Sequence, residues 1–371
     1  MDAGYRARRC RRSQQRLSLT VAKLPLTLRR RFPTTVTMRY RTLGNTGLKI
    51  SEIGFGCGNN AVLMVRASYE EQMSAVRHAL DLGINYFDTA FAYGLGKSEE
   101  NLGRILSEIG ASPVVSTKIR LEPEAASNLQ AATVRAVEAG LKRLQRKSVD
   151  LIQLHNRVTL QKTQGKRFSA TPKDVLGPGG VLDGFKEMRE KGKVRYFGFS
   201  GLGDPRALRE LVDSGEFHSF QAYYNLLNPS AGQPVPNGFS ALDYGRLIDR
   251  AAEKGMGVAV IRVLAAGALT STPGTGGGST PEPLSPGSDY ALDLRRAEKV
   301  KFLIGGDIKS LTEAAIRFAL MKPEVSTVLV GFSNVFHIDE AVACSGAGGL
   351  SDEALARLRK LWNADFERLS S

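Results

Sequence analysis

The sequence alternates eight times between a short apolar segment and a longer segment that has the apolar spacing of a helix. Strands are expected at Glu52–Gly56, Asn85–Asp88, Val114–Thr117, Leu151–Leu154, Val194–Phe199, Ser219–Ala222, Met256–Val263 and Thr327–Val330. Because these strands are apolar throughout, both of their faces should be buried. Eight such units in sequence favour a closed (β/α)8 TIM barrel, a fold that occupies one domain at this chain length.

The segments between these strands carry the signals of amphipathic helices. A capping box, Ser68-x-x-Glu71, stands before Met73, Val76 and Leu80, which share one helical face. The same spacing relates Leu102, Ile105, Leu106 and Ile109, and also Leu182, Phe185 and Met188. A final amphipathic helix is expected at Ser351–Leu369.

A short hairpin is expected ahead of the barrel. Tyr40–Ile50 contains two short strand-like runs around Asn45-Thr46-Gly47, where glycine accommodates a positive φ angle. We therefore divide the chain into a leader, residues 1–37, and a barrel domain, residues 38–371.

The basic charge of the chain is concentrated in the leader. Residues 1–37 hold ten Lys and Arg against one acid, Asp2, and so carry most of the net charge of +14. The leader is rich in Arg, Ser and Thr and has no long apolar run, which is typical of a mitochondrial or plastid transit peptide rather than a secretory signal or membrane span. Translation from Met38, which would leave a cytoplasmic protein, and a basic disordered tail are the alternatives. The body has no basic-aromatic motif, so we expect no nucleic-acid partner. The leader has no long apolar run, and we expect no membrane partner.

The three cysteines, Cys10, Cys57 and Cys344, form no CxxC pair. Their odd number argues against a disulfide scaffold, and their spacing argues against a zinc site, so no metal is expected. We expect Cys57 to be a small buried residue, because no base lies near it in sequence.

Two long segments interrupt the repeat on the carboxyl-end side of the strands. Asn156–Gly180 follows the fourth strand and is basic at Lys162, Lys166 and Arg167. Ser271–Gly287 follows the seventh strand and is rich in Gly, Pro, Ser and Thr. Because TIM barrels keep their chemistry at this face, we expect both segments to be loops over a ligand.

Four ionisable residues stand at or just beyond the ends of the second, third and fourth strands. They are Asp88, Tyr93, Lys118 and His155. Each alone could mark only the place where the chain reaches the surface. Because parallel strands of a barrel end at one mouth, the four together indicate acid-base chemistry.

These residues lie in segments that resemble the aldo-keto reductase family. Tyr86-Phe-Asp-Thr-Ala-Phe-Ala-Tyr-Gly94 resembles the segment with its catalytic Asp and Tyr, whereas Ser116-Thr-Lys118 and Asp150-Leu-Ile-Gln-Leu-His155 resemble the segments with its Lys and His. The resemblance runs from Met38 nearly to the C-terminus. It implies an NAD(P)H-dependent oxidoreductase that acts on a small carbonyl or alcohol, with the hairpin closing the amino end of the barrel.

The implied chemistry requires a proton donor for the carbonyl oxygen. An unperturbed tyrosine, with a pKa of about 10, is a poor donor near neutral pH. We expect the Lys118 ammonium to lower the pKa of Tyr93, and Asp88 to keep Lys118 charged. His155 would orient the carbonyl, with its tautomer set by the partner of its second ring nitrogen.

The resemblance also implies a cofactor site, although no G-x-G-x-x-G motif follows the first strand. Ser200 and Gln221 resemble the residues that hold the nicotinamide carboxamide. The segment with the adenosine phosphate would contain Gly331, Ser333, Asn334, His337 and Glu340, and the nicotinamide turn would contain Leu264.

Three positions depart from the family pattern. Gly201 replaces the usual Asn, Ile261 and Arg262 replace an aromatic residue and Ser, and Ser333 replaces an Arg often placed against the 2′-phosphate. The resemblance to the family implies NADP as the cofactor. NAD is the alternative, because the guanidinium that would favour the 2′-phosphate is missing.

Two alternatives to carbonyl reduction stay open. One is oxidation of a sugar or secondary alcohol by the same residues. The other is a cofactor-sensing regulatory subunit, since one fold can support different functions.

Overall fold

Eight parallel strands close into a barrel in the computed structural model, which describes residues 37–59, 62–162, 168–271, 273 and 289–366. The strands are β3 (Ile53–Gly56), β4 (Tyr86–Asp88), β5 (Val114–Ile119), β6 (Val149–Leu154), β7 (Val194–Ser200), β8 (Ser219–Tyr223), β9 (Gly257–Ile261) and β10 (Val325–Gly331). Each strand pairs with the next, and β10 pairs with both β9 and β3, which closes the barrel. The predicted TIM barrel is confirmed, and every strand end lies within two residues of its expected position.

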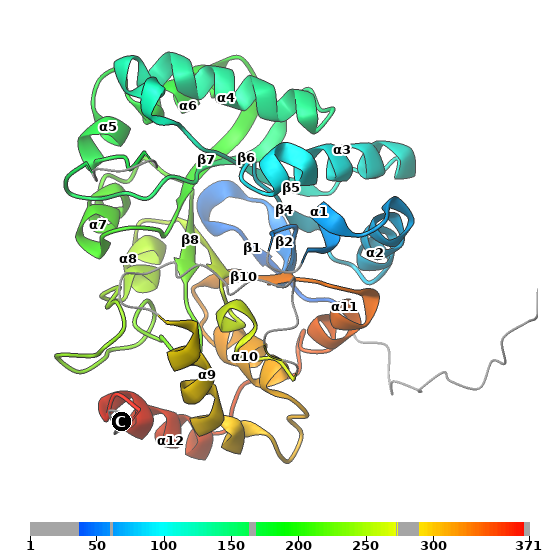
Figure 1. The fold of residues 1–371 in the computed structure, drawn as a ribbon, viewed down its shortest axis with the longest axis vertical. Helices are drawn as coiled ribbons and strands as arrows, with labels where there is room; N and C mark the ends of the chain where they lie inside the picture. Colours follow the sequence, from blue (N-terminus) through cyan, green and yellow to red (C-terminus); the bar gives the residue numbers. More distant parts are fainter. Residues whose placement is uncertain (1–36, 60–61, 163–167, 272, 274–288, 367–371) are drawn as a thin grey trace, which may run out of the picture. The chain divides into compact units, whose positions relative to one another are not determined.

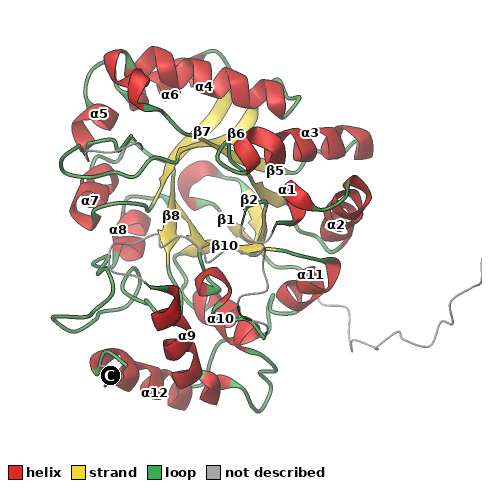
Figure 2. Cartoon of the chain, in the orientation of Figure 1, coloured by secondary structure: helices red, strands yellow, loops and turns green. Residues whose placement is uncertain are grey.

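Helices follow the strands and enclose them (Figures 1 and 2). They are α1 (Leu63–Arg66), α2 (Tyr69–Asp81), α3 (Lys97–Ile109), α4 (Leu129–Arg143), α5 (Pro172–Leu176), α6 (Val181–Glu190), α7 (Pro205–Asp213), α8 (Leu247–Glu253), α9 (Tyr290–Lys299), α10 (Leu311–Leu320), α11 (Val335–Val342) and α12 (Asp352–Asn363). The capping box at Ser68 and Glu71 is present at the start of α2. Its two reciprocal hydrogen bonds satisfy backbone N–H groups that a helix start leaves free.

The expected hairpin is present and closes one end of the barrel. Strands β1 (Tyr40–Thr42) and β2 (Lys49–Ser51) pair antiparallel, and Gly47 has a φ angle of 73° in the turn between them. Three buried hairpin side chains pack against residues inside the barrel: Leu43, Leu48 and Ile50. The N–H of Asn45 donates to the carbonyl of Gly255, just before β9, at 2.8 Å. The hairpin therefore covers the end at which the strands begin.

Two segments differ from the expectation. The segment Asn156–Gly180 contains the short helix α5, which begins with a capping box formed by Thr171 and Asp174. Helix α12 ends at Asn363, before the expected end at Leu369, because Asp365 and Phe366 adopt positive φ angles. Residues beyond 366 lie outside the described part of the chain.

Several expectations fall on residues that the structure does not describe. They concern the leader up to residue 36, Lys166 and Arg167, and nearly all of the segment from 271 to 287. Within the described ranges, no helix is both long and apolar enough to cross a membrane.

Candidate active site

The four ionisable residues expected at the barrel mouth lie at the carboxyl ends of neighbouring strands. Asp88 is the last residue of β4, Lys118 is the second-last residue of β5, and His155 directly follows β6. Tyr93 lies in the connection after β4, directly before the 3-10 turn η2 (Gly94–Gly96). Because β4, β5 and β6 are adjacent and parallel, their carboxyl ends bring these side chains together.

Lys118 is the centre of this group. Its ammonium forms an ion pair with the Asp88 carboxylate and donates to the carbonyl of Thr89 at 3.0 Å. It also lies 3.2 Å from the hydroxyl oxygen of Tyr93. The side chain is almost fully buried, so these contacts replace the water that the charge would otherwise need.

Burial and the ion pair set the protonation of Lys118 and Tyr93. Burial alone would lower the pKa of Lys118, but the Asp88 carboxylate and the Tyr93 hydroxyl together outweigh this effect, so the pKa is raised. Burial raises the pKa of Tyr93, and the Lys118 ammonium offsets only part of that rise. The net direction for Tyr93 is thus opposite to the expected one, since the sequence gives no measure of burial at the hydroxyl. Lys118 is charged and Tyr93 is protonated near neutral pH.

His155 faces Tyr93 as a neutral ring. The two ring centroids lie 5.7 Å apart, and the planes are nearly perpendicular. Burial, together with the charges of Lys118 and Arg120, lowers the pKa of His155 to about 3. Among the described residues, the buried Nδ1 atom has no hydrogen-bond partner, so the expected tautomer-setting partner is not found there.

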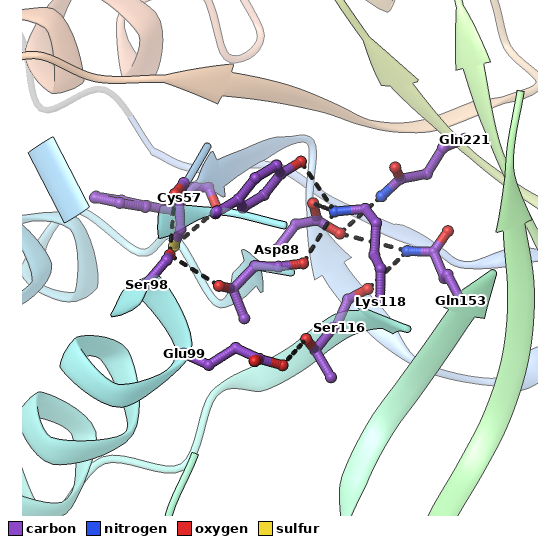
Figure 3. A network of polar contacts seen from close by, with 12 residues as sticks. Cys57, Asp88, Ser98, Glu99, Ser116, Lys118, Gln153 and Gln221 are labelled. Atoms are coloured by element: carbon purple, nitrogen blue, oxygen red, sulfur yellow. Dashed lines mark hydrogen bonds and ion pairs between the residues drawn. The ribbon is translucent and has the colours of Figure 1, made fainter. Parts of the chain in front are cut away.

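Two glutamines approach the second oxygen of Asp88 (Figure 3). The amide nitrogen of Gln221 lies 2.7 Å from Asp88 Oδ2, and that of Gln153 lies 3.4 Å from the same atom. Gln153 also donates to the hydroxyl of Ser116 at 2.7 Å. Gln153 was not among the residues expected at this site. Its signal is a polar residue in a buried strand, two positions before His155.

A second buried network supports the segment that carries Tyr93. The carboxylate of Glu99, on α3, accepts from the Thr117 hydroxyl and from Arg143 on α4, each at 2.6 Å. The Arg143 guanidinium lies over the ring of Phe91, 4.8 Å from its centroid. The sequence analysis assigned no role to Glu99, because only the fold shows that this helical carboxylate is buried.

The residues expected to hold the nicotinamide carboxamide lie beside the ion pair. Ser200 ends β7 and pairs in register with Gln221 on β8. Both side chains are buried, and within the described ranges the hydroxyl of Ser200 has no partner. Such an unpartnered buried hydroxyl next to an amide suits a polar ligand group that both donates and accepts.

The residues expected to hold the adenosine phosphate lie at the end of β10 and on α11. Gly331 ends β10, and Asn334 caps α11 by accepting from the backbone N–H of His337 at 3.1 Å. Ser333 is exposed. Glu340 accepts from the Ser310 hydroxyl at 2.7 Å, so its carboxylate is directed toward the start of α10.

Leu264 lies in a tight turn after β9. Its carbonyl accepts from the N–H groups of Gly267 and Leu269. The neighbouring residues Arg262, Ala265 and Ala266 all have positive φ angles, which are strained for residues with a side chain. The turn is therefore held in a specific conformation at the barrel mouth.

The cysteines within the described ranges are buried. Burial raises the pKa of both the Cys57 and the Cys344 thiol, so each remains protonated near neutral pH. No group of three or more His, Cys, Asp or Glu among the described residues is arranged to hold a metal ion.

Comparisons with known proteins agree with the fold. A model described as the aldo/keto reductase family matches residues 52–363. L-galactose dehydrogenase of Arabidopsis thaliana is 28% identical, with 82% of this chain and 86% of that protein covered. The uncharacterized oxidoreductase YqkF of Bacillus subtilis is 25% identical, with 89% and 98% covered. The holo form of a Bacillus halodurans aldo-keto reductase superposes with a TM-score of 0.67 at 24% identity, covering 88% of this chain and 97% of that one.

Proposed function

Because the chain belongs to the aldo/keto reductase family, we propose that it transfers hydride between NADP and an aldehyde or ketone, with Tyr93 as the proton donor. Family membership supports NAD(P)H-dependent oxidation and reduction of carbonyl compounds. The choice of donor rests on one observation, the 3.2 Å contact between the Tyr93 hydroxyl and the Lys118 ammonium.

The side chains beside the ion pair fit a nicotinamide group. Ser200 and Gln221 offer a hydroxyl and an amide, which together can match both the donor and the acceptor of a carboxamide. Bound there, the dinucleotide supplies or accepts the hydride. Gly331, Ser333, Asn334, His337 and Glu340 would hold the adenosine phosphate, and Leu264 would contact the nicotinamide. NAD is the alternative cofactor, because Ser333 offers no guanidinium to a 2′-phosphate.

The protein side chains supply the proton and the orientation. Tyr93 donates its proton to the carbonyl oxygen, and the Lys118 ammonium aids this step because it lowers the Tyr93 pKa that burial raises. The Lys118 ammonium then stabilises the tyrosinate, while Asp88 keeps Lys118 in place. His155, neutral near pH 7, can hydrogen-bond the same oxygen without adding a second charge.

Oxidation of a sugar or secondary alcohol is the second candidate. It is favoured by the 28% sequence identity to L-galactose dehydrogenase. Alcohol oxidation would use the same residues in the reverse direction, with the Tyr93 tyrosinate as the base. A cofactor-sensing subunit would use the same site but would turn over slowly.

A cofactor screen tests this proposal. The purified protein is mixed with NADPH or NADH and a panel of aldehydes and ketones, and with the oxidised cofactors and a panel of sugars and alcohols. Absorbance at the reduced-nicotinamide band follows each reaction. Multiple turnovers with any carbonyl or alcohol support an enzyme, whereas a single slow turnover with every compound would support the sensor.

For residues 1–37 we propose a transit peptide that directs the protein to a mitochondrion or plastid. The basic, nearly acid-free composition supports this proposal. A fluorescent fusion with and without residues 1–37 tests it, and identical cytoplasmic distributions would contradict it.

A further inference from the structure

We propose that Gln153 is a positioning residue for the ion pair between Asp88 and Lys118. Its side chain keeps the Asp88 carboxylate directed at Lys118. This inference rests on the proposed function of Asp88, Lys118 and Tyr93. Neither the family resemblance nor the acid-base analysis gave Gln153 a role.

Gln153 lies inside the barrel beside the ion pair. It pairs in register with Lys118 on the neighbouring strand, so the two side chains leave the sheet on the same face. The Gln153 side chain is fully buried. Its amide nitrogen lies between the Ser116 hydroxyl, at 2.7 Å, and Asp88 Oδ2, at 3.4 Å (Figure 3).

The bond to Ser116 fixes the position of this amide. The longer contact with Asp88 is a weak hydrogen bond. The main effect of Gln153 is therefore geometric, because the anchored amide occupies the space into which the carboxylate could otherwise turn. Asp88 Oδ1 then faces the ammonium of Lys118.

Gln221 cannot replace Gln153 in this role. Its amide nitrogen lies closer to Asp88 Oδ2, at 2.7 Å, but the same side chain is proposed to bind the nicotinamide carboxamide. A ligand at Gln221 competes for that amide. Gln153 is buried and bonded to Ser116, so it can hold Asp88 whether or not a ligand is bound.

If the Asp88 carboxylate is held less firmly, we expect the pKa of Tyr93 to change, because Lys118 contacts both residues. The negative charge of Asp88 raises the pKa of Tyr93, and the Lys118 ammonium lowers it. Without the amide at position 153, the Asp88 carboxylate can turn away from Lys118, and the ammonium is held less well against Tyr93. Tyr93 becomes a poorer acid, and the tyrosinate needed for alcohol oxidation forms at higher pH.

The test substitutes the amide without changing the length of the side chain. In Gln153→Met we expect kcat to fall about tenfold, because the Asp88 carboxylate and, through it, the Lys118 ammonium are held less precisely. The KM for the cofactor should stay within about twofold, because the amide of Gln153 is bonded to Ser116 and is not among the groups proposed to bind the dinucleotide. The pH at which alcohol oxidation rises should move upward. Gln72→Met is the matched control, since Gln72 is equally buried, donates to the carbonyl of Ala67 and likewise has an amide oxygen without a partner in the described part of the chain.

Gln153→Asn provides a second variant, because it keeps an amide at this position but is one methylene too short to reach Asp88. Circular dichroism melting identifies which variants are folded. A folded variant at position 153 with the kcat and pH profile of the parent would overturn the inference, as would an equal loss in Gln72→Met. A parent without turnover on any compound would instead overturn the proposed function, and the inference with it.

Discussion

Burial has different consequences for the three titratable groups around the proposed substrate oxygen. It keeps Tyr93 protonated and His155 neutral, whereas Lys118 remains charged because Asp88 is its partner. The site therefore combines one balanced ion pair with two neutral hydrogen-bonding groups. When Tyr93 donates its proton, the tyrosinate lies beside the Lys118 ammonium, which stabilises the new negative charge.

The neutral state of His155 predicts a pH dependence of stability. Its pKa is about 3 in the folded protein, against about 6.5 in an unfolded chain. Between these values the unfolded chain binds the extra proton, so stability falls as the pH falls below about 6.5, by about 1 kcal/mol per pH unit. Urea unfolding of the parent and of His155→Gln at several pH values measures this loss.

The variant should lose less stability toward acid than the parent does. His337→Gln is the control, because that side chain is exposed. Parallel acid profiles for the parent and His155→Gln would show that His155 is not held neutral by the fold.

The positions of the site residues could be predicted from the sequence, but the burial and the hydrogen-bond partners of their side chains could not. Asp88, Lys118 and His155 could be placed together because each follows or ends a parallel strand. Gln153 was missed, although it is two residues from His155, because a polar residue within a strand has no recognisable role until its neighbours are known. Lys118 lowers the pKa of Tyr93 as expected, but the larger rise caused by burial was not predicted, since burial depends on the assembled loops.

At the scale of elements, strands were easier to predict than helix ends. The strands are mostly apolar and are buried on both faces, so their positions follow directly from the sequence. Helix α12 ends early where Asp365 accepts from Arg296 of α9, at 3.2 Å, and Phe366 is buried. These contacts join segments that are far apart in the sequence, so no local sequence pattern predicts them. Helix α5 has a capping box in its sequence, but its five residues are too few to show a periodic apolar face.

The packing of α3 against the end of α4 depends on a glycine. A Cβ atom on Gly103 would lie 2.2 Å from the carbonyl oxygen of Leu144. We expect Gly103→Ala to lower the free energy of unfolding by about 2 kcal/mol through this overlap, although alanine alone favours a helix by about 1 kcal/mol. Chemical denaturation measures the change.

Ser107→Ala on the exposed face of the same helix is the control for helix propensity. Its stability should differ from that of the parent by no more than about 0.5 kcal/mol. Stabilisation by Gly103→Ala would mean that α3 and α4 do not approach as closely as the structure indicates.

In the barrel as a whole, the hairpin that stabilises the fold and the residues of the candidate active site lie at opposite ends. The hairpin packs where the strands begin, and the ion pair lies where they end. This separation is typical of TIM barrels. Substitutions in the hairpin should therefore change stability without changing the site.

Ile50 tests the separation of the two ends. Its side chain is fully buried in the hairpin cluster, so Ile50→Ala should cost about 3 kcal/mol of unfolding free energy. At a temperature where the variant is still folded, kcat should remain within about twofold of the parent. A much larger loss of kcat in the folded variant would show that the hairpin affects the mouth.

The central claim is that Tyr93, activated by Lys118, supplies the proton. The most direct measurement is the single-turnover rate of hydride transfer in Tyr93→Phe, compared with the parent and with Tyr196→Phe, whose lost hydroxyl bonds the Thr46 carbonyl at the other end of the barrel. We expect the Tyr93→Phe rate to fall by about 10² to 10⁴, with cofactor affinity nearly unchanged, and the Tyr196→Phe rate to match the parent. Equal rates in Tyr93→Phe and the parent would contradict the account.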